Sequence, residues 1–175
     1  AKPDSLSWST IGVGSGSHLV LEWFRTQGIS FLHVPFKGGE QAMNAVVGAQ
    51  VDMSLNASGR TAPMIRAGKL KAYGTTFQQR VAQARDIPTI AEQGYPKFET
   101  DSWYGIVAPA AAPKEAIARM NAEFNRALSD PALRNTLTER GLEVIGGTPE
   151  EFGDHIRNEI AKYAQIVRQS NMKID

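Results

Sequence analysis

Short runs rich in apolar and β-branched residues alternate with amphipathic stretches along the first 80 residues, and glycines lie at most of the junctions. The apolar runs predict strands over residues 6–13, 29–36, 51–55 and 70–76. The amphipathic stretches predict helices, each followed by a glycine, over residues 18–27, 40–47 and 60–67. Because strands alternate with helices, the pattern predicts right-handed βαβ units and a largely parallel sheet.

The regular alternation of strand-like and helix-like segments ends at Gln78. Residues 87–94 predict a capped helical turn, and residues 98–108 form a β-rich run long enough to cross from one lobe to another. Further elements are predicted as a helix over 114–128, a short helix from Asp130 that ends at Gly141, and a short strand over 142–145.

The last helix has the clearest start signal in the chain. Thr148 stands at the cap position, Pro149 at the first helical position and Glu151 three residues after the cap. An apolar stripe follows at helical spacing and predicts a core face, through Phe152, Ile156, Ile160, Tyr163 and Val167. Only one short strand is predicted near this helix, so we expect part of its lobe to be missing.

Composition excludes several classes of function. The chain has 175 residues, of which 42% are hydrophobic and 21% charged, as is typical of a globular domain. A net charge of +1 lacks the basic excess of nucleic-acid binders. The absence of cysteine excludes thiol catalysis, zinc–thiolate sites and iron–sulfur clusters. No run approaches the roughly 18 apolar residues of a membrane helix. The first residues, Ala-Lys-Pro-Asp, are not a signal peptide, so we expect that one is absent or was removed upstream.

Helix starts in the alternating half supply the candidate binding groups. In a parallel sheet these starts gather at the carboxyl edge, where free N–H groups and helix dipoles favour an anion. Two starts are rich in glycine, Gly14-Ser15-Gly16-Ser17-His18 and Lys37-Gly38-Gly39, and the third runs from Asn56 to Arg60. They predict a carboxylate or phosphate site, with Ser15 and Ser17 as added hydroxyl donors. The alternative is that these residues only form tight turns and helix caps.

Motifs for catalysis, metals and nucleotides are absent from the sequence. The spacing of Gly12, Gly14 and Gly16 does not fit a dinucleotide fingerprint, and no Walker, GxSxG, HxH or HExxH pattern occurs. Ser15 and His18 resemble a nucleophile and base, but no acid is placed to orient them. We therefore expect no catalytic residues, no metal and no cofactor.

Four further polar residues can be interpreted as functional residues or as ordinary structural ones. His18, at a helix start, is either a neutral donor or a packing residue, whereas His33 is expected to be a satisfied buried histidine and His155 a solvated one. Asp52 is expected to hydrogen-bond backbone groups rather than a ligand. The aromatic pair Trp103 and Tyr104 is expected to pack at a junction between lobes rather than to stack on a ligand.

Five segments in order carry a resemblance to a known family: WSTIGVGSGSHL, HVPFKGGEQAMNAVVGAQVDM, PMIRAGKLKAYGTT, DIPTIAEQGYPKFETDSWYGIVAPAAAP and GGTPEEFGDHIRNEIAKYAQIVRQSN. They resemble the extracytoplasmic solute-binding proteins of tripartite tricarboxylate transporters, also called the Bug family. The resemblance covers essentially the whole chain, which corresponds to the C-terminal three-fifths of a typical member.

The resemblance implies the fold class, the domains and the function. The implied fold is α/β, a type II periplasmic binding protein (Venus flytrap) with one lobe essentially complete, residues 1–105, and the C-terminal part of the other, residues 106–175. The implied function is capture of a small carboxylate between the lobes in the bacterial periplasm and its delivery to a membrane permease. No nucleic acid is involved, and self-association through exposed helices of the incomplete lobe is a further expectation.

Carried over by the same resemblance, the expected ligand-binding residues lie at the three helix starts: Gly14, Ser15, Gly16, Ser17, His18, Phe36, Lys37, Gly38, Gly39 and Asn56. The third start departs from the family pattern, because Asn56 replaces an acidic residue and Arg60 is added. Both changes predict a more strongly anionic ligand. Two alternatives remain from the residues alone, an effector-binding module of a transcriptional regulator and a small-acid enzyme that uses Ser15 and His18.

Overall fold

A computed structural model describes residues 4–80, 85–96, 98, 100, 102–170 and 172. The chain divides into two compact units. Unit 1 combines Ala1–Asp101 with Ala161–Asp175, and unit 2 is Ser102–Ile160.

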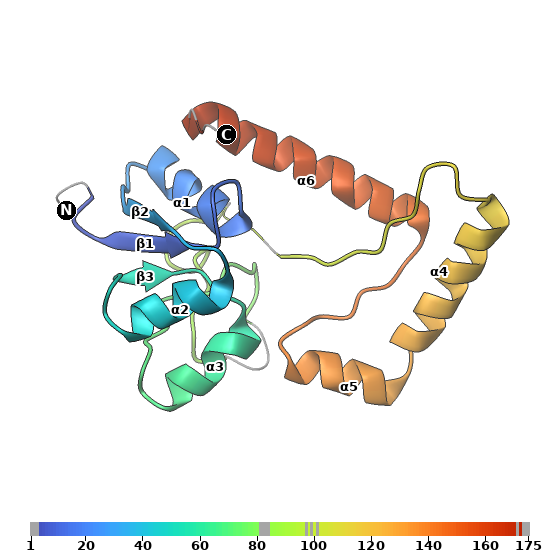
Figure 1. Ribbon diagram of the computed structural model, residues 1–175, viewed down its shortest axis with the longest axis horizontal. Helices are drawn as coiled ribbons and strands as arrows, with labels where there is room; N and C mark the ends of the chain where they lie inside the picture. Colours follow the sequence, from blue (N-terminus) through green and yellow to red (C-terminus); the bar gives the residue numbers. More distant parts are fainter. Residues whose placement is uncertain are drawn as a thin grey trace. The chain divides into compact units, whose positions relative to one another are not determined.

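Unit 1 contains a parallel three-stranded sheet with the order β2-β1-β3 (Figure 1). The strands are β1 (Ser7–Thr10), β2 (Leu32–Pro35) and β3 (Met53–Ser54), with Ser7 opposite Leu32 and Trp8 opposite Met53. Each strand is followed by a helix, α1 (Gly16–Thr26), α2 (Gly39–Val47) and α3 (Ser58–Arg66). The predicted alternation and parallel sheet are confirmed, with strands shorter than the apolar runs suggested.

The core of unit 1 is aromatic. The buried cluster contains Trp8, Val20, Leu21, Phe31 and Phe98, so β1, the inner face of α1 and residues from outside the sheet all contribute. Trp23 lies 4.2 Å from Phe98 between ring centroids. Burial of large apolar side chains contributes about 1.5–3 kcal/mol each, which makes this face of α1 the main anchor of the unit.

The predicted strand over residues 70–76 is wrong. In the described part of the chain this segment does not join the sheet and makes a single parallel bridge, between Thr75 and Thr89. Thr75 donates its N–H to Pro88 O at 2.9 Å and accepts from Ile90 N–H at 2.9 Å. Residues 88–90 thus satisfy these backbone groups, and β3 is an edge strand of the described sheet.

The capped turn predicted over residues 87–94 is present. Thr89 Oγ1 accepts from Glu92 N–H at 3.1 Å, and a Glu92 carboxylate oxygen accepts from Thr89 N–H at 2.7 Å. This reciprocal pair is a capping box. Thr89 is fully buried, so the turn is fixed against unit 1.

Unit 2 is built from helices and extended segments. It contains α4 (Lys114–Leu128), α5 (Pro131–Glu139) and the first part of α6 (Pro149–Ser170). Asp130 Oδ1 caps α5 by accepting from Leu133 N–H at 2.9 Å. The predicted capping box at Thr148 and Glu151 is confirmed, with distances of 2.8 and 3.2 Å between the paired atoms.

The strand predicted over residues 142–145 is wrong, because these residues lie outside any strand. In the β-rich run over 98–108 the described residues also lie outside any strand, and residues 99 and 101 lie outside the described part. These segments have β-rich sequences, but the described structure offers them no neighbouring strand to pair with. A strand forms only where a partner accepts its backbone hydrogen bonds.

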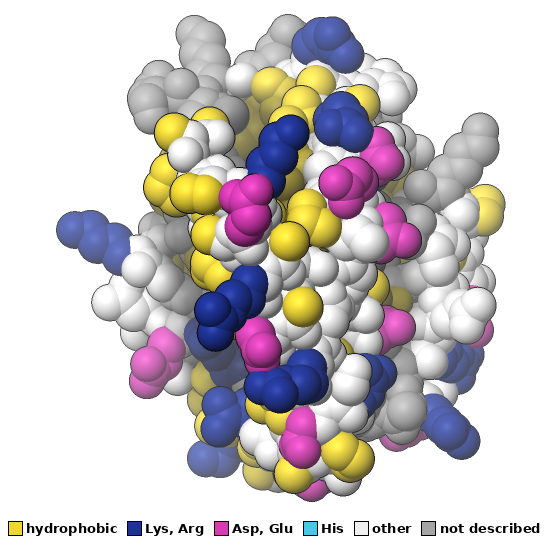
Figure 2. All heavy atoms as spheres, turned by 90° about the vertical axis from the view of Figure 1, so that its right-hand side faces the viewer, with side chains coloured by type: hydrophobic (Ala, Val, Ile, Leu, Met, Phe, Trp, Pro, Cys, Tyr) yellow, Lys and Arg dark blue, Asp and Glu magenta, His cyan; other side chains and the backbone are white. Residues whose placement is uncertain are grey.

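The apolar faces of unit 2 stay largely exposed. Among the described residues, α4, α5 and α6 contain no buried side chain. In the stripe of α6 that was predicted to form a core, Ile160 is 64% exposed and the other four residues are half-buried, so the stripe contains no fully buried side chain. Figure 2 shows hydrophobic side chains between charged ones on the face where α4 lies nearest the viewer.

Candidate functional site

Three loops at the carboxyl edge of the sheet form the candidate site, which we call the rim: residues 12–18, 36–39 and 56–60. The parallel order places the start of each following helix at this edge. A Cβ atom on Gly12 would lie 3.7 Å from Phe36 O, and one on Gly39 would lie 3.3 Å from Asn56 Oδ1. The structure therefore brings the three predicted helix starts side by side.

The first loop is shaped by its glycines and serines. Gly14 has a φ of +78°, a conformation that favours glycine. Ser15 caps α1, since its Oγ accepts from His18 N–H at 3.3 Å and donates to Gly12 O at 2.7 Å. Ser17 is buried, and its Oγ accepts from Ile11 N–H at 3.1 Å. Both hydroxyls are thus engaged within the loop.

The other two helix starts leave backbone donors uncapped. Gly38 precedes α2 and Ala57 precedes α3, and neither position has a side-chain hydrogen bond to the helix. In the first turn of α3, Arg60 N–H already donates to Ala57 O at 3.0 Å, so the remaining first-turn N–H groups of the two helices are the donors available to an anion. The positive end of each helix dipole adds to the attraction. Gly39 has no side chain to cover this donor set, and Phe36 is half-buried beside it with its N–H donated to Thr10 O at 2.9 Å.

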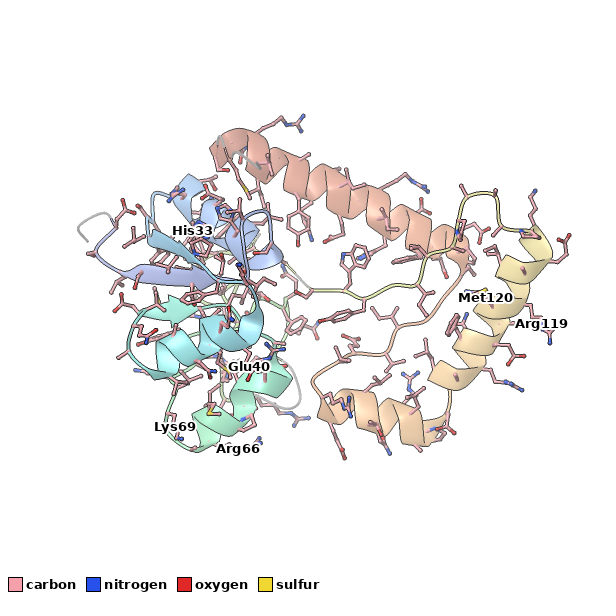
Figure 3. The ribbon with its side chains drawn as sticks, in the orientation of Figure 1. His33, Glu40, Arg66, Lys69, Arg119 and Met120 are labelled. Carbon is pink, nitrogen blue, oxygen red and sulfur yellow. The ribbon has the colours of Figure 1, made fainter. Side chains whose placement is uncertain are left out.

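Positive side chains flank these donors. Lys37 and Arg60 are exposed, and within the described part of the chain neither pairs with a carboxylate. A Cβ atom on Gly39 would lie 2.5 Å from Arg60 Nη1, so the guanidinium lies directly over this glycine. Asn56 donates from Nδ2 to Ser54 Oγ. Figure 3 shows the one acidic side chain of the first turn of α2, Glu40, near the start of α3, with Arg66 and Lys69 at the other end of that helix.

Two stacked histidines lie beneath the first loop. The rings of His18 and His33 lie 4.1 Å apart between centroids at 16°. Gly14 N–H donates to His18 Nδ1 at 3.2 Å, and His33 Nε2 lies 2.7 Å from Thr10 Oγ1. Burial lowers the pKa of His18 below its ordinary value, although Glu22 acts in the opposite direction. Burial and then the neighbouring His18 lower the pKa of His33.

The remaining polar predictions fall outside the rim. Asp52 Oδ2 accepts from Ser7 N–H at 2.8 Å and from Ser7 Oγ at 2.6 Å, which confirms the backbone-bonding interpretation. The exposed His155 stacks edge-on with Trp103 at 5.2 Å between centroids. Tyr104 is 82% exposed.

Sequence reasoning missed Glu22, which is 2% exposed although it is charged. It lies four residues after His18 within an otherwise apolar stretch of α1. That spacing places the two side chains on one face of the helix and is the signal that could have revealed it.

Two further features are absent from the described part of the chain. There, no three His, Asp or Glu side chains are grouped closely enough to hold a metal ion. Likewise, none of the described helices is long and apolar enough to cross a membrane.

Comparison with known proteins gives one consistent family. Residues 1–172 match the family model described as tripartite tricarboxylate transporter family receptor. The UPF0065 protein of the tcbD–tcbE intergenic region of Pseudomonas sp. strain P51 is 32% identical over 94% of this chain and 50% of its own length. The chain thus spans about half the length of this relative, and likewise of Protein BugT of Bordetella pertussis, to which it is 27% identical.

Solved structures show the same fold. R. palustris Rpa4515 with adipate superposes with a TM-score of 0.89 and 28% identity, over 98% of this chain and 57% of that one. MatC from Rhodopseudomonas palustris with bound malate gives a TM-score of 0.78 and 30% identity, over 94% and 57% of the two chains. The expected α/β fold of periplasmic solute-binding proteins is confirmed.

Proposed function

Because the chain belongs to the tripartite tricarboxylate transporter family of receptors, we propose that it is the carboxylate-binding part of an extracytoplasmic solute receptor. The receptor captures a small dicarboxylate and presents it to the membrane permease of a tripartite transporter. Residues 1–105 are proposed as lobe two and residues 106–175 as the C-terminal part of lobe one. The relatives solved with adipate and with malate bind ligands of this class.

The observation that carries the proposal is the pair of uncapped helix starts at the rim. The first turns of α2 and α3 offer backbone donors with no side-chain acceptor, and Lys37 and Arg60 stand beside them. Such an arrangement suits an anion with more than one oxygen. The proposed ligand-binding residues are those of the three starts: Gly14, Ser15, Gly16, Ser17, His18, Phe36, Lys37, Gly38, Gly39 and Asn56.

The geometry of the first loop argues for binding rather than catalysis. Ser15 Oγ donates to Gly12 O, and the two ring nitrogens of His18 face Gly14 N–H and Glu22. The imidazole is therefore engaged away from the Ser15 hydroxyl, and the pair lacks the geometry of a nucleophile and its base. The family is a family of receptors, and we propose that this chain has no catalytic activity.

Binding is tested by thermal shift and calorimetry with malate, adipate and aspartate. Aspartate replaces the malate hydroxyl with an ammonium group, so this pair isolates the effect of ligand charge. Malate at a hundred times its Kd should add about 2.7 kcal/mol, or about 5–11 °C in Tm. A preference for aspartate would contradict the preference for an anionic ligand that is assigned to the rim. The absence of binding with all three ligands would overturn the proposal.

The role of Arg60 is tested with the same ligands, and a variant at Arg140 is the matched control. Arg60→Gln removes the positive charge over Gly39, so we expect weaker malate binding and a smaller preference over aspartate. Arg140→Gln removes an exposed arginine of unit 2 and should leave both quantities unchanged.

Self-association is proposed for this chain through unit 2. On its helices, Phe124 of α4 and Ile160 of α6 are 41% and 64% exposed, and outside the helices Tyr104 and Ile145 are 82% and 84% exposed. Exposed apolar side chains favour contact with another protein surface. A second copy of the chain is the proposed partner.

A further inference from the structure

Glu22 is buried in α1 without an evident reason in stability. It is 2% exposed; its Oε1 accepts from Arg25 Nη1 at 2.6 Å and lies 3.4 Å from His18 Nε2. Within the described part of the chain, Glu22 Oε2 is buried and has no hydrogen-bond partner. Replacement of a buried ion pair by apolar residues is often neutral or stabilising, so this carboxylate needs a functional explanation.

The hydrogen bonds of His18 determine where its proton lies. Gly14 N–H donates to His18 Nδ1 at 3.2 Å, and a ring nitrogen that accepts a hydrogen bond carries no proton. Neutral His18 therefore carries its proton on Nε2, the atom that faces the Glu22 carboxylate. A carboxylate beside one ring nitrogen selects the tautomer with the proton on that nitrogen.

The Nε2–H tautomer of His18 supports the first loop of the rim. Gly14 lies in the middle of that loop with a positive φ, a conformation that its neighbours must hold in place. His18 Nδ1 holds its N–H from below, and the ring itself is fixed by stacking on His33, which Figure 3 labels on β2. The chain of contacts thus runs from the Glu22 carboxylate through His18 to Gly14.

We propose that Glu22 is a positioning residue for carboxylate binding: it holds His18 with its proton on Nε2, so that Nδ1 anchors Gly14 N–H and keeps the first loop in its ligand-binding shape. This inference rests on the proposed function. Glu22 does not touch the ligand and acts through His18. If His18 Nδ1 gained a proton, it would become a donor facing the Gly14 N–H donor, and the hydrogen bond between them would be lost. Carboxylate affinity therefore falls as His18 becomes charged.

The charged groups around His18 define the pH range of this effect. Glu22 and Arg25 face it from α1, and His33 faces it from β2. Burial and Arg25 favour the neutral imidazole, while Glu22 favours the charged one. Because burial prevails, the pKa of His18 lies below its ordinary value, and the anchor is intact at neutral pH.

The test combines NMR of His18 and Gly14 with malate calorimetry from pH 8.0 to 5.5, corrected for the ionisation of malate. At pH 7.5 the wild-type ¹⁵N shifts should show the Nε2–H tautomer. In Glu22→Leu, His18 should populate both tautomers, the Gly14 amide signal should move, and malate should bind about tenfold more weakly. Glu22→Gln keeps an acceptor of the same shape and should recover most of the Nε2–H population and the affinity.

A matched control is Glu123→Leu, which removes a glutamate that pairs with an arginine three residues later, Arg126, on the exposed surface of α4. It should leave the His18 and Gly14 signals and the affinity unchanged.

Three results would overturn the inference: a wild-type His18 protonated on Nδ1, wild-type affinity and pH profile in Glu22→Leu, or malate affinity that rises as the pH falls. If wild type binds no malate while Glu22→Leu shifts the His18 and Gly14 signals as expected, the proposed function fails and the control of the loop by Glu22 stands.

Discussion

At the scale of single residues, the rim depends on the absence of a side chain at Gly39. A Cβ atom there would lie 2.5 Å from Arg60 Nη1 and 3.3 Å from Asn56 Oδ1. The backbone at Gly39 is helical and accommodates alanine. A methyl group there would compete only with the Arg60 and Asn56 side chains for space. Affinity and stability should therefore respond differently to substitution at this position.

Gly39→Ala tests this separation. The end of the Arg60 side chain can move, so we expect Tm to be unchanged or slightly higher, since alanine favours helices over glycine and Gly39 is the first residue of α2. Malate affinity should fall several-fold, by about 1 kcal/mol, because the methyl group displaces the guanidinium from the donor set. Calorimetry and thermal unfolding measure both quantities. Gly153→Ala in α6 is the control, and equal malate affinity in Gly39→Ala and wild type would contradict the placement of Arg60.

The stacked histidines make the stability of the chain depend on pH. Burial lowers the pKa of both His18 and His33, so between the lowered values and 6.5 the unfolded chain binds more protons than the folded one. Stability is therefore fully present above pH 6.5 and declines as the pH falls below it. Urea unfolding at pH 7.5, 6.5 and 5.5 should show this decline. His33→Gln should flatten it in part, whereas His155→Gln should preserve it; an unchanged slope in His33→Gln would show that this ring does not contribute.

At the scale of elements, helix starts are the best-defined features of the chain. Thr148 and Glu151 exchange hydrogen bonds at the start of α6, and Thr89 and Glu92 do the same in the turn after residue 87. These pairs were predictable because a cap depends on residues three positions apart. The strands predicted over 70–76 and 142–145 were wrong because a strand depends on a partner that local sequence does not identify.

Removal of the α6 cap gives a quantitative test. Thr148→Ala leaves Glu151 N–H without its acceptor and should lower the free energy of unfolding by about 1 kcal/mol, with Thr148→Ser restoring most of it. The control is Thr136→Ala in α5, where the hydroxyl donates to Ala132 O within the helix and contributes little. Urea unfolding followed by circular dichroism measures the three variants. Equal losses at Thr148 and Thr136 would mean that the box does not hold the helix start.

At the scale of the whole molecule, the two units differ in how they are stabilised. Unit 1 has an aromatic core around Trp8 and Phe98, whereas the described helices of unit 2 contain no buried side chain. A unit without a core relies on its helix caps and on contacts with other surfaces. The exposed apolar residues of unit 2 are therefore the place where we expect this chain to associate.

Light scattering after size exclusion should show a mass that rises with protein concentration. Tyr104→Ser combined with Ile145→Ser removes two of the most exposed apolar side chains of unit 2 and should shift the equilibrium toward the monomer. Tyr73→Ser removes an exposed tyrosine of unit 1, 63% exposed, and should leave the mass unchanged. A monomer at all concentrations in the wild-type chain would contradict the proposed self-association.

By itself, the sequence determined the alternation of strands and helices in unit 1, the three helix starts of the rim, the range of α4 and the cap of α6. Each of these is encoded in the spacing of residues within one or two helical turns. The same local patterns carried the resemblance to the receptor family, which the family match confirms.

Only the tertiary structure decided which groups meet. It placed Arg60 over Gly39, buried the Ser17 hydroxyl beneath the first loop, and set His33 of β2 against His18 and Glu22 of α1. These contacts join residues from different elements, and sheet order and helix packing, rather than local spacing, bring them together. The physical reason is that a parallel sheet collects at one edge what the chain separates by 20 residues or so.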